Sequence, residues 1–81
     1  MVLRILPHGA DDARRWRFHA RQKLEELPDG GVIVRFRSSG MRELAWHLFT
    51  WQDKAEVVAP QALKDMLRSE LDVAMRTHVR I

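Results

Sequence analysis

The feature that most constrains this chain is the PDGG turn at residues 28–31, which lies between two runs of alternating apolar and polar residues. Proline presets the backbone angle that a turn needs, aspartate favours a turn, and glycine adopts positive φ without steric cost. The flanking runs span residues 18–27 and 32–37. Together they predict a β-hairpin whose side chains alternate between the two faces of the strands.

The other elements follow from periodicity and from the residues that end each run. A short aliphatic run at residues 2–6 predicts a strand, and so does the AEVVA run at residues 55–59. Acids followed by arginines predict a short helix at residues 10–16. Apolar residues recur at helical spacing from Met41, and again from Pro60 to about His78. The order β-α-β-β-α-β, with an additional C-terminal helix, predicts an α+β fold, a ferredoxin-like sandwich in one domain of residues 1–81.

Composition excludes several classes of protein. The chain has no cysteine, and therefore no disulfide and no thiolate zinc site, which fits the reducing cytoplasm where we expect it to act. Its apolar share of 46% is too high for a disordered segment. No apolar run approaches the roughly 18 residues that a membrane span requires. We therefore expect no contact with a membrane.

Catalytic motifs are also missing from the sequence, which has no GxSxG turn, no phosphate-binding loop and no cysteine nucleophile. The adjacent acids Glu25 and Glu26 would point to opposite faces of a strand, so they cannot act as a pair. No two of the four histidines have the i, i+4 spacing of a helical zinc site. We expect neither an enzyme nor a metal or cofactor site.

Basic residues concentrate in the first half of the chain, where residues 1–42 hold nine Lys or Arg against five Asp or Glu. Alternation in the predicted hairpin gathers a histidine and four cations on one face of the sheet. We call this set the basic strip: His19, Arg21, Lys23, Arg35 and Arg37. Three interpretations stay open, namely a solvated or inter-domain face, part of a site for an anionic effector, and a nucleic-acid surface. The strip has no Phe, Tyr or Trp on which bases could stack, which disfavours readout by stacking.

One tryptophan is a candidate for a protein interface. Trp46 lies off the apolar stripe of the helix that begins at Met41, so we expect it to be exposed. Exposed tryptophans on small domains tend to mark contacts with protein. An open sheet face or an unpaired edge is also a surface that a small domain tends to cover. We expect a homodimer that forms through the sheet, its edge or the Trp46 side of the helix.

The whole chain resembles the C-terminal extension domain, called WCX, of WYL-type bacterial transcription regulators. The family often has tryptophan, histidine and, three residues on, glutamine, followed by a hydrophobic strand and a DG turn; Phe18, His19 and Gln22 hold those positions. The GMREL segment at residues 40–44 looks like the family's helix before its fourth strand. The AEVVAPQAL segment at residues 55–63 is similar to the family's EV-x-x-P-x-x-L signature.

Two departures from the family pattern stand out. Phe18 occupies a position where tryptophan is common, and Gln52-Asp53 stands where glycine often ends the helix. Neither change conflicts with the expected fold.

The resemblance implies a regulatory domain that belongs to a longer regulator and contributes to dimerisation and effector sensing. Such regulators carry an N-terminal winged helix-turn-helix that binds DNA and a central WYL domain. The resemblance thus implies contact with DNA only through that N-terminal domain. It also makes the basic strip a candidate site for an anionic or nucleic-acid effector. The alternative is a free-standing small nucleic-acid-binding module that uses a basic sheet face.

Overall fold

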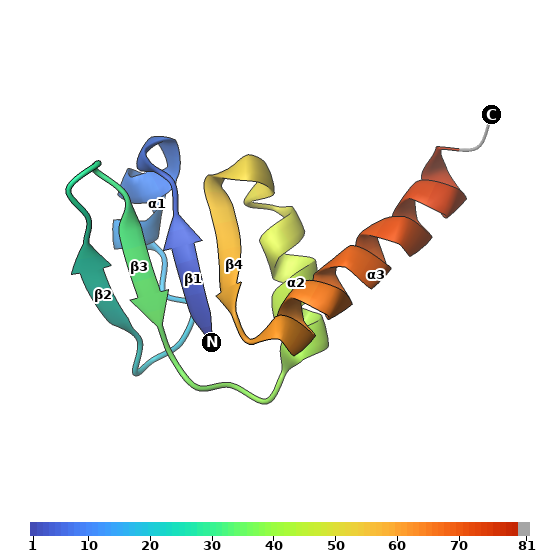
Figure 1. Cartoon of the computed structure of the whole chain (residues 1–81), viewed down its shortest axis with the longest axis horizontal. Helices are drawn as coiled ribbons and strands as arrows, with labels where there is room; N and C mark the ends of the chain where they lie inside the picture. Colours follow the sequence, from blue (N-terminus) through green and yellow to red (C-terminus); the bar gives the residue numbers. More distant parts are fainter. Residues whose placement is uncertain (80–81) are drawn as a thin grey trace.

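Four strands form one antiparallel sheet in the order β2-β3-β1-β4 in the computed structural model, which describes residues 1–79 (Figure 1). The strands are β1 (Val2–Ile5), β2 (Lys23–Glu26), β3 (Val32–Arg35) and β4 (Ala55–Ala59). The helices are α1 (Ala10–Arg15), α2 (Met41–Phe49) and α3 (Gln61–His78), with short 3₁₀ helices η1 (Pro7–Gly9) and η2 (Gln52–Lys54). The fold is α+β with three α-helices, as predicted. The two 3₁₀ segments were not predicted, and residues 80–81 of the predicted domain lie outside the described residues.

The hairpin between β2 and β3 confirms the prediction from the PDGG turn. The Gly30 N–H donates to the Leu27 carbonyl at 3.0 Å, and the Leu27 N–H donates to the Gly31 carbonyl at 2.9 Å. Gly30 has a φ of 89°, which glycine adopts without strain. A Cβ on Gly31 would lie 2.7 Å from the Ile5 carbonyl oxygen, so this position needs a residue without a side chain.

Asp29 adds a second set of bonds to the same turn. Its Oδ1 accepts the Gly31 N–H at 2.8 Å, and its Oδ2 lies 3.2 Å from the Arg4 guanidinium on β1. The Gly31 hydrogen bond, followed by the hydrogen bond and the charge of Arg4, holds the pKa of Asp29 below its ordinary value. The turn is thereby tied to the neighbouring strand as well as to itself.

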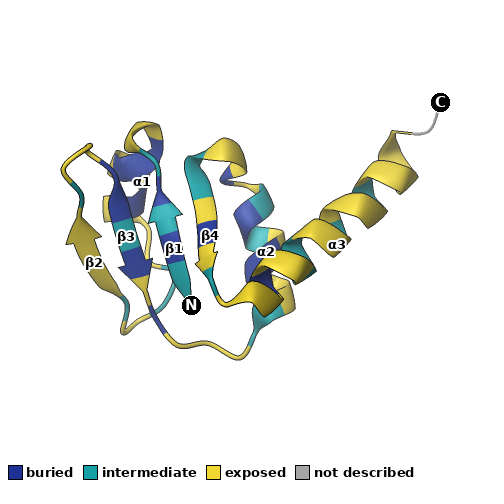
Figure 2. Ribbon diagram, viewed as in Figure 1, coloured by how far each residue is buried: buried dark blue, intermediate teal, exposed yellow. Residues whose placement is uncertain are grey.

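Alternate positions of three strands form the core of the domain. Leu3 lies opposite Val34, and Ile5 lies opposite Val32, and all four side chains are fully buried. They join one cluster with residues of α1, α2, β4 and α3, among them Ala13, Leu44, Ala45, Leu48, Val57 and Leu63. Figure 2 shows that burial concentrates in β1 and β3, whereas every residue of the edge strand β2 is exposed.

The strand before the turn is shorter than the sequence pattern predicts. The prediction began it at residue 18, but β2 spans only Lys23–Glu26. Residues 16–22 instead form an irregular loop with a turn at residues 20–21. Alternation was a poor guide here, because Phe18 packs against other aromatic rings and does not follow the pleat of a strand.

The helix α2 ends one residue before Thr50, and the chain then makes a tight return to β4. Gln52, the residue that stands where the family often has glycine, has a φ of 53°. This left-handed conformation is the one that glycine adopts most readily. At this position the backbone therefore has the conformation typical of glycine, although the residue is glutamine.

The long helix α3 packs against α2 and β4 mainly by its first half. Leu63 is fully buried, whereas Leu71 and Met75 are 45% and 59% exposed. Figure 1 shows the second half of α3 extending away from the sheet. Among the helices of residues 1–79, none is both long and apolar enough to cross a membrane.

Two neighbouring valines on β4, one buried and one exposed, form a matched pair for measuring how much the core contributes to the free energy of unfolding. Val57 is 6% exposed and Val58 is 43% exposed. We expect Val57→Ala to lower the free energy of unfolding by about 1.5–3 kcal/mol, because it removes buried methyl groups and leaves a cavity. Val58→Ala, the control, should change it by less than about 0.5 kcal/mol. Urea unfolding measures both, and equal losses would contradict the assignment of the two faces of β4.

Candidate functional site

The five residues of the basic strip surround one shallow hollow of about 720 Å³ at the side of the sheet. They approach it from three places: the loop between α1 and β2, the strands β2 and β3, and the segment that follows β3. Val2 and Phe36 supply apolar surface between them. The structure therefore brings together every residue that the sequence predicted for this site.

Three of these five residues lie outside the strands in which the sequence predicted them. His19 and Arg21 were expected on a strand face, but both lie in the loop before β2. Arg37 likewise follows the end of β3 at Arg35. Only Lys23 and Arg35 are strand residues, and they lie directly opposite each other in the β2–β3 register.

The charges around the hollow are only partly neutralised. The Arg35 guanidinium lies 3.4 Å from the Glu25 carboxylate, and this ion pair is half-exposed at both ends. Within residues 1–79, Arg21, Lys23 and Arg37 make no ion pair. Two cations directly opposite on neighbouring strands repel each other. The hollow thus carries a net positive charge that an anion would reduce.

The side chain of Gln22 fixes the course of the loop that carries His19 and Arg21. Its Oε1 accepts the N–H groups of Phe18 at 2.6 Å and His19 at 3.2 Å. Its Nε2 donates to the carbonyl of Trp16 at 3.5 Å. One carboxamide therefore satisfies three backbone groups that have no strand partner, which is how the chain can turn here.

Aromatic rings hold the same loop from the other side. The rings of Phe18 and His19 each stack nearly parallel to the ring of Phe36, with centroid distances of 6.1 Å and 5.9 Å. Phe18 also contacts Trp51 at 5.0 Å and the edge of His47 at 5.7 Å. The rings of Phe18 and Phe36 thereby connect the basic hollow to the end of α2.

Sequence reasoning did not identify this aromatic group. His47 and Trp51 are four residues apart at the end of a predicted helix, which is the spacing that puts two side chains on one face. That spacing was the available signal. Their partners Trp16 and Phe18 are about thirty residues earlier in the chain, and no local pattern relates them.

The histidines occupy separate places in the structure. His8 lies 3.3 Å from Asp53, His47 belongs to the aromatic group, and His78 ends α3. His19 accepts the Arg21 N–H on Nδ1 at 3.1 Å, which orients its ring beside the hollow. In the part of the chain that is described, no three His, Asp or Glu side chains gather as metal ligands do.

The predicted interface residue Trp46 is 51% exposed on α2, as the helical stripe predicted. It lies on the face of α2 opposite the buried Leu44 and Leu48. Its position leaves a large apolar surface available to another protein.

Gln22 provides a direct test of what positions the loop. We expect Gln22→Ala to lower the free energy of unfolding by about 1–2 kcal/mol, because two backbone N–H groups and one carbonyl lose their partner. Gln22→Glu, which keeps an acceptor for both N–H groups, should recover part of that loss. Gln61→Ala is the control, because its bond to Asp65 is exposed. Urea unfolding distinguishes them, and a Gln22→Ala value equal to the control would mean that the loop is held by its rings alone.

The comparison with known protein families agrees with the sequence resemblance. The family model of the WCX domain matches residues 1–75 of the chain. No curated protein matches the chain. The matched segment covers every strand and most of α3, including the loop that Gln22 organises. The chain therefore belongs to the WCX domain family.

Proposed function

We propose that the chain is the C-terminal regulatory domain of a WYL-type bacterial transcription regulator, and that it contributes to dimerisation and effector sensing. The observation that carries the proposal is the match to the WCX family over residues 1–75. The partners are then the WYL domain and the winged helix-turn-helix of the same full-length chain. Contact with DNA is made through that N-terminal domain. A reading frame that encodes neither domain upstream of this chain would contradict the proposal.

The proposal includes a ferredoxin-like fold for this domain. The strand order β2-β3-β1-β4 and the antiparallel pairing of all neighbours support it, because two split β-α-β units produce such a sheet. The short helix η1 before α1 and the helix η2 before β4 are local additions to that order.

The basic strip is the proposed contribution to effector sensing. Arg21, Lys23 and Arg37 surround the hollow, and none of the three forms an ion pair with an acidic side chain among residues 1–79. An anion in the hollow would therefore not compete with a carboxylate for these cations. The hollow is open to solvent in this domain. A WYL domain that covers it would exclude water and strengthen each charge interaction. An organic anion or a nucleic-acid end fits this chemistry.

The second half of α3 is the proposed contribution to dimerisation. Leu71 and Met75 continue the apolar stripe that Leu63 begins in the core, but they are largely exposed. Lys23 and Glu25 on the edge strand β2 oppose edge-to-edge pairing of sheets, because charged side chains there disfavour another strand. A second copy of α3 would cover the exposed stripe, and Trp46 lies on the neighbouring helix.

The basic strip can be tested with a small polyanion. We expect tripolyphosphate to bind the chain, and Arg21→Gln with Arg35→Gln to weaken that binding about tenfold, a change of about 1.4 kcal/mol. The dependence on salt should also become shallower, because fewer charges take part. The control removes two α3 cations, by Arg68→Gln with Arg76→Gln. Calorimetry measures each affinity, and equal weakening in both double variants would mean that net charge alone binds the polyanion.

Self-association through α3 can be tested in the same way. We expect sedimentation to show a dimer whose dissociation constant rises at least about tenfold in Leu71→Gln with Met75→Gln, because both apolar contacts are lost. The control is Val73→Gln, which changes an equally exposed position off the stripe. Glutamine keeps helix propensity in all variants. A chain that stays monomeric at high micromolar concentration would count against α3 as the dimer contact.

A further inference from the structure

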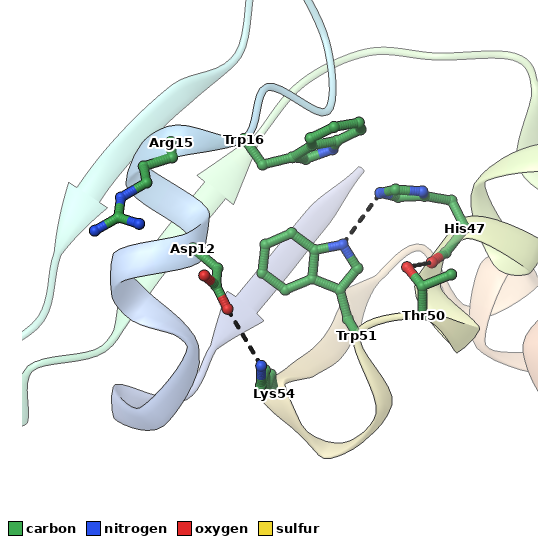
Figure 3. Close-up of a pocket in the computed structure, with 7 residues that line it drawn as sticks. All are labelled: Asp12, Arg15, Trp16, His47, Thr50, Trp51 and Lys54. Atoms are coloured by element: carbon green, nitrogen blue, oxygen red, sulfur yellow. Dashed lines mark hydrogen bonds and ion pairs between the residues drawn. The ribbon is translucent and has the colours of Figure 1, made fainter.

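A second hollow lies between the C-terminal ends of α1 and α2, away from the basic strip. It encloses about 380 Å³ and is the subject of Figure 3. Its lining consists of aromatic rings and charged or hydroxyl-bearing side chains, namely Asp12, Arg15, Trp16, His47, Thr50, Trp51 and Lys54. The volume falls in the range of sites for small molecules, at its lower end.

Two indole rings provide the flat surfaces of this pocket. Trp51 is only 7% exposed, and its Nε1–H donates to Nε2 of His47 at 3.1 Å, which fixes the orientation of both rings. Trp16 is 49% exposed, and it stacks on His47 with a centroid distance of 5.0 Å and an interplanar angle of 20°. In Figure 3 the rings of Trp16 and His47 border the indole of Trp51. A half-exposed tryptophan is thus held in one orientation by a ring beneath it.

The charged groups of the pocket leave one cation without a partner. Lys54 Nζ lies 3.2 Å from the Asp12 carboxylate, so these two charges offset each other. Arg15 lines the same pocket and takes part in none of the ion pairs formed within residues 1–79. An arginine binds a planar carboxylate through two parallel N–H bonds. The pocket therefore combines flat apolar surfaces with one positive side chain at its rim, and in Figure 3 the guanidinium of that side chain extends away from the indoles.

The ends of the helices narrow the choice of anion. Trp16 follows the last residue of α1, and Thr50 is the residue that follows α2. Both helices direct their C-terminal ends toward the pocket, where the helix dipole disfavours negative charge. A doubly charged phosphate would meet two such ends and no helix N-terminus. A single carboxylate meets less of this repulsion than a phosphate does, and the cationic Arg15 at the end of α1 offsets it.

We propose that this pocket binds a small aromatic carboxylate. The ring lies against the indoles of Trp16 and Trp51, where stacked aromatic rings attract each other beyond the effect of buried area. The carboxylate accepts hydrogen bonds from the Arg15 guanidinium, an exposed side chain that turns toward the ligand on binding. One ring or two fused rings fill the available volume. The site is separate from the basic strip and does not depend on the regulatory function proposed above.

Indole-3-acetate is a suitable probe, and NMR of the ¹⁵N-labelled chain is a suitable readout. The three tryptophans each give an indole N–H signal, so Trp46, which is outside the pocket, is an internal control. We expect saturable shifts at Trp16 and Trp51 at millimolar ligand or below, with Trp46 unchanged. Cyclohexylacetate, which lacks the flat ring, and tryptamine, which carries an ammonium, should bind about tenfold more weakly or less.

Matched variants separate the pocket from general binding. Trp16→Leu and Arg15→Gln should each weaken indole-3-acetate about tenfold, whereas Trp46→Leu, a change at an equally exposed tryptophan, should not. Arg21→Gln with Arg35→Gln should also leave this affinity unchanged, so the test stays independent of the basic strip. Arg15→Gln changes an exposed side chain and tests the carboxylate even if Trp16→Leu disturbs the loop.

Three results would overturn the proposal. The first is the absence of saturable shifts at Trp16 and Trp51 at millimolar indole-3-acetate. The second is equal weakening by Trp46→Leu, which would indicate non-specific contact with exposed rings. The third is binding of tryptamine as tight as that of indole-3-acetate, which would assign the pocket to a cation held by the indole faces.

Discussion

The arrangement of this domain's surface depends on the hydrogen bonds that the carboxamide of Gln22 makes. Three backbone groups between α1 and β2 have no strand partner, and the two ends of this one side chain satisfy them. Without those bonds, the desolvated N–H groups of Phe18 and His19 would favour a different course of the chain. The loop instead turns toward the helices, and β2 begins only at Lys23.

This turn of the loop determines where both hollows form. Trp16, at the start of the loop, stacks on His47 and borders the pocket between the ends of α1 and α2, here called the aromatic pocket. His19 and Arg21, near its end, border the basic hollow. Phe18 between them packs against Phe36 and Trp51, so that ring contacts run from one hollow to the other. A single short loop therefore supplies side chains to two chemically different surfaces.

The remainder of the surface divides between charge and apolar area. The exposed edge strand β2 consists of one leucine among charged residues, and these charges disfavour pairing with a strand of another molecule. The sheet face is not uniformly basic, because Glu25 pairs with Arg35 and Asp29 pairs with Arg4. Although Trp16, Leu24 and Val58 are exposed elsewhere, exposed apolar side chains are most frequent on the far half of α3 and include Trp46 on α2. These are the places where another protein surface would remove the most apolar area from water.

Local sequence determined the elements and their order. The PDGG turn specified the hairpin, because glycine adopts the positive φ at Gly30 without strain and leaves room for the close approach at Gly31. The buried residues Val32, Val34 and Leu63 follow the periods of β3 and α3, because burial on one face follows the period of each element. The five residues of the basic strip were also found from the sequence, and they do surround one hollow.

Tertiary structure alone decided where β2 begins, which cation Glu25 pairs with, and that Trp16 meets His47 and Trp51. Periodicity relates a residue to neighbours two, three or four positions away, because those spacings follow from the geometry of a strand or a helix. It carries no information on contacts between residues about thirty positions apart. The aromatic pocket consists of such contacts, since α1 and α2 meet only when both cover the same core. The sequence therefore determined the elements and the basic residues, and the folded chain determined the pocket.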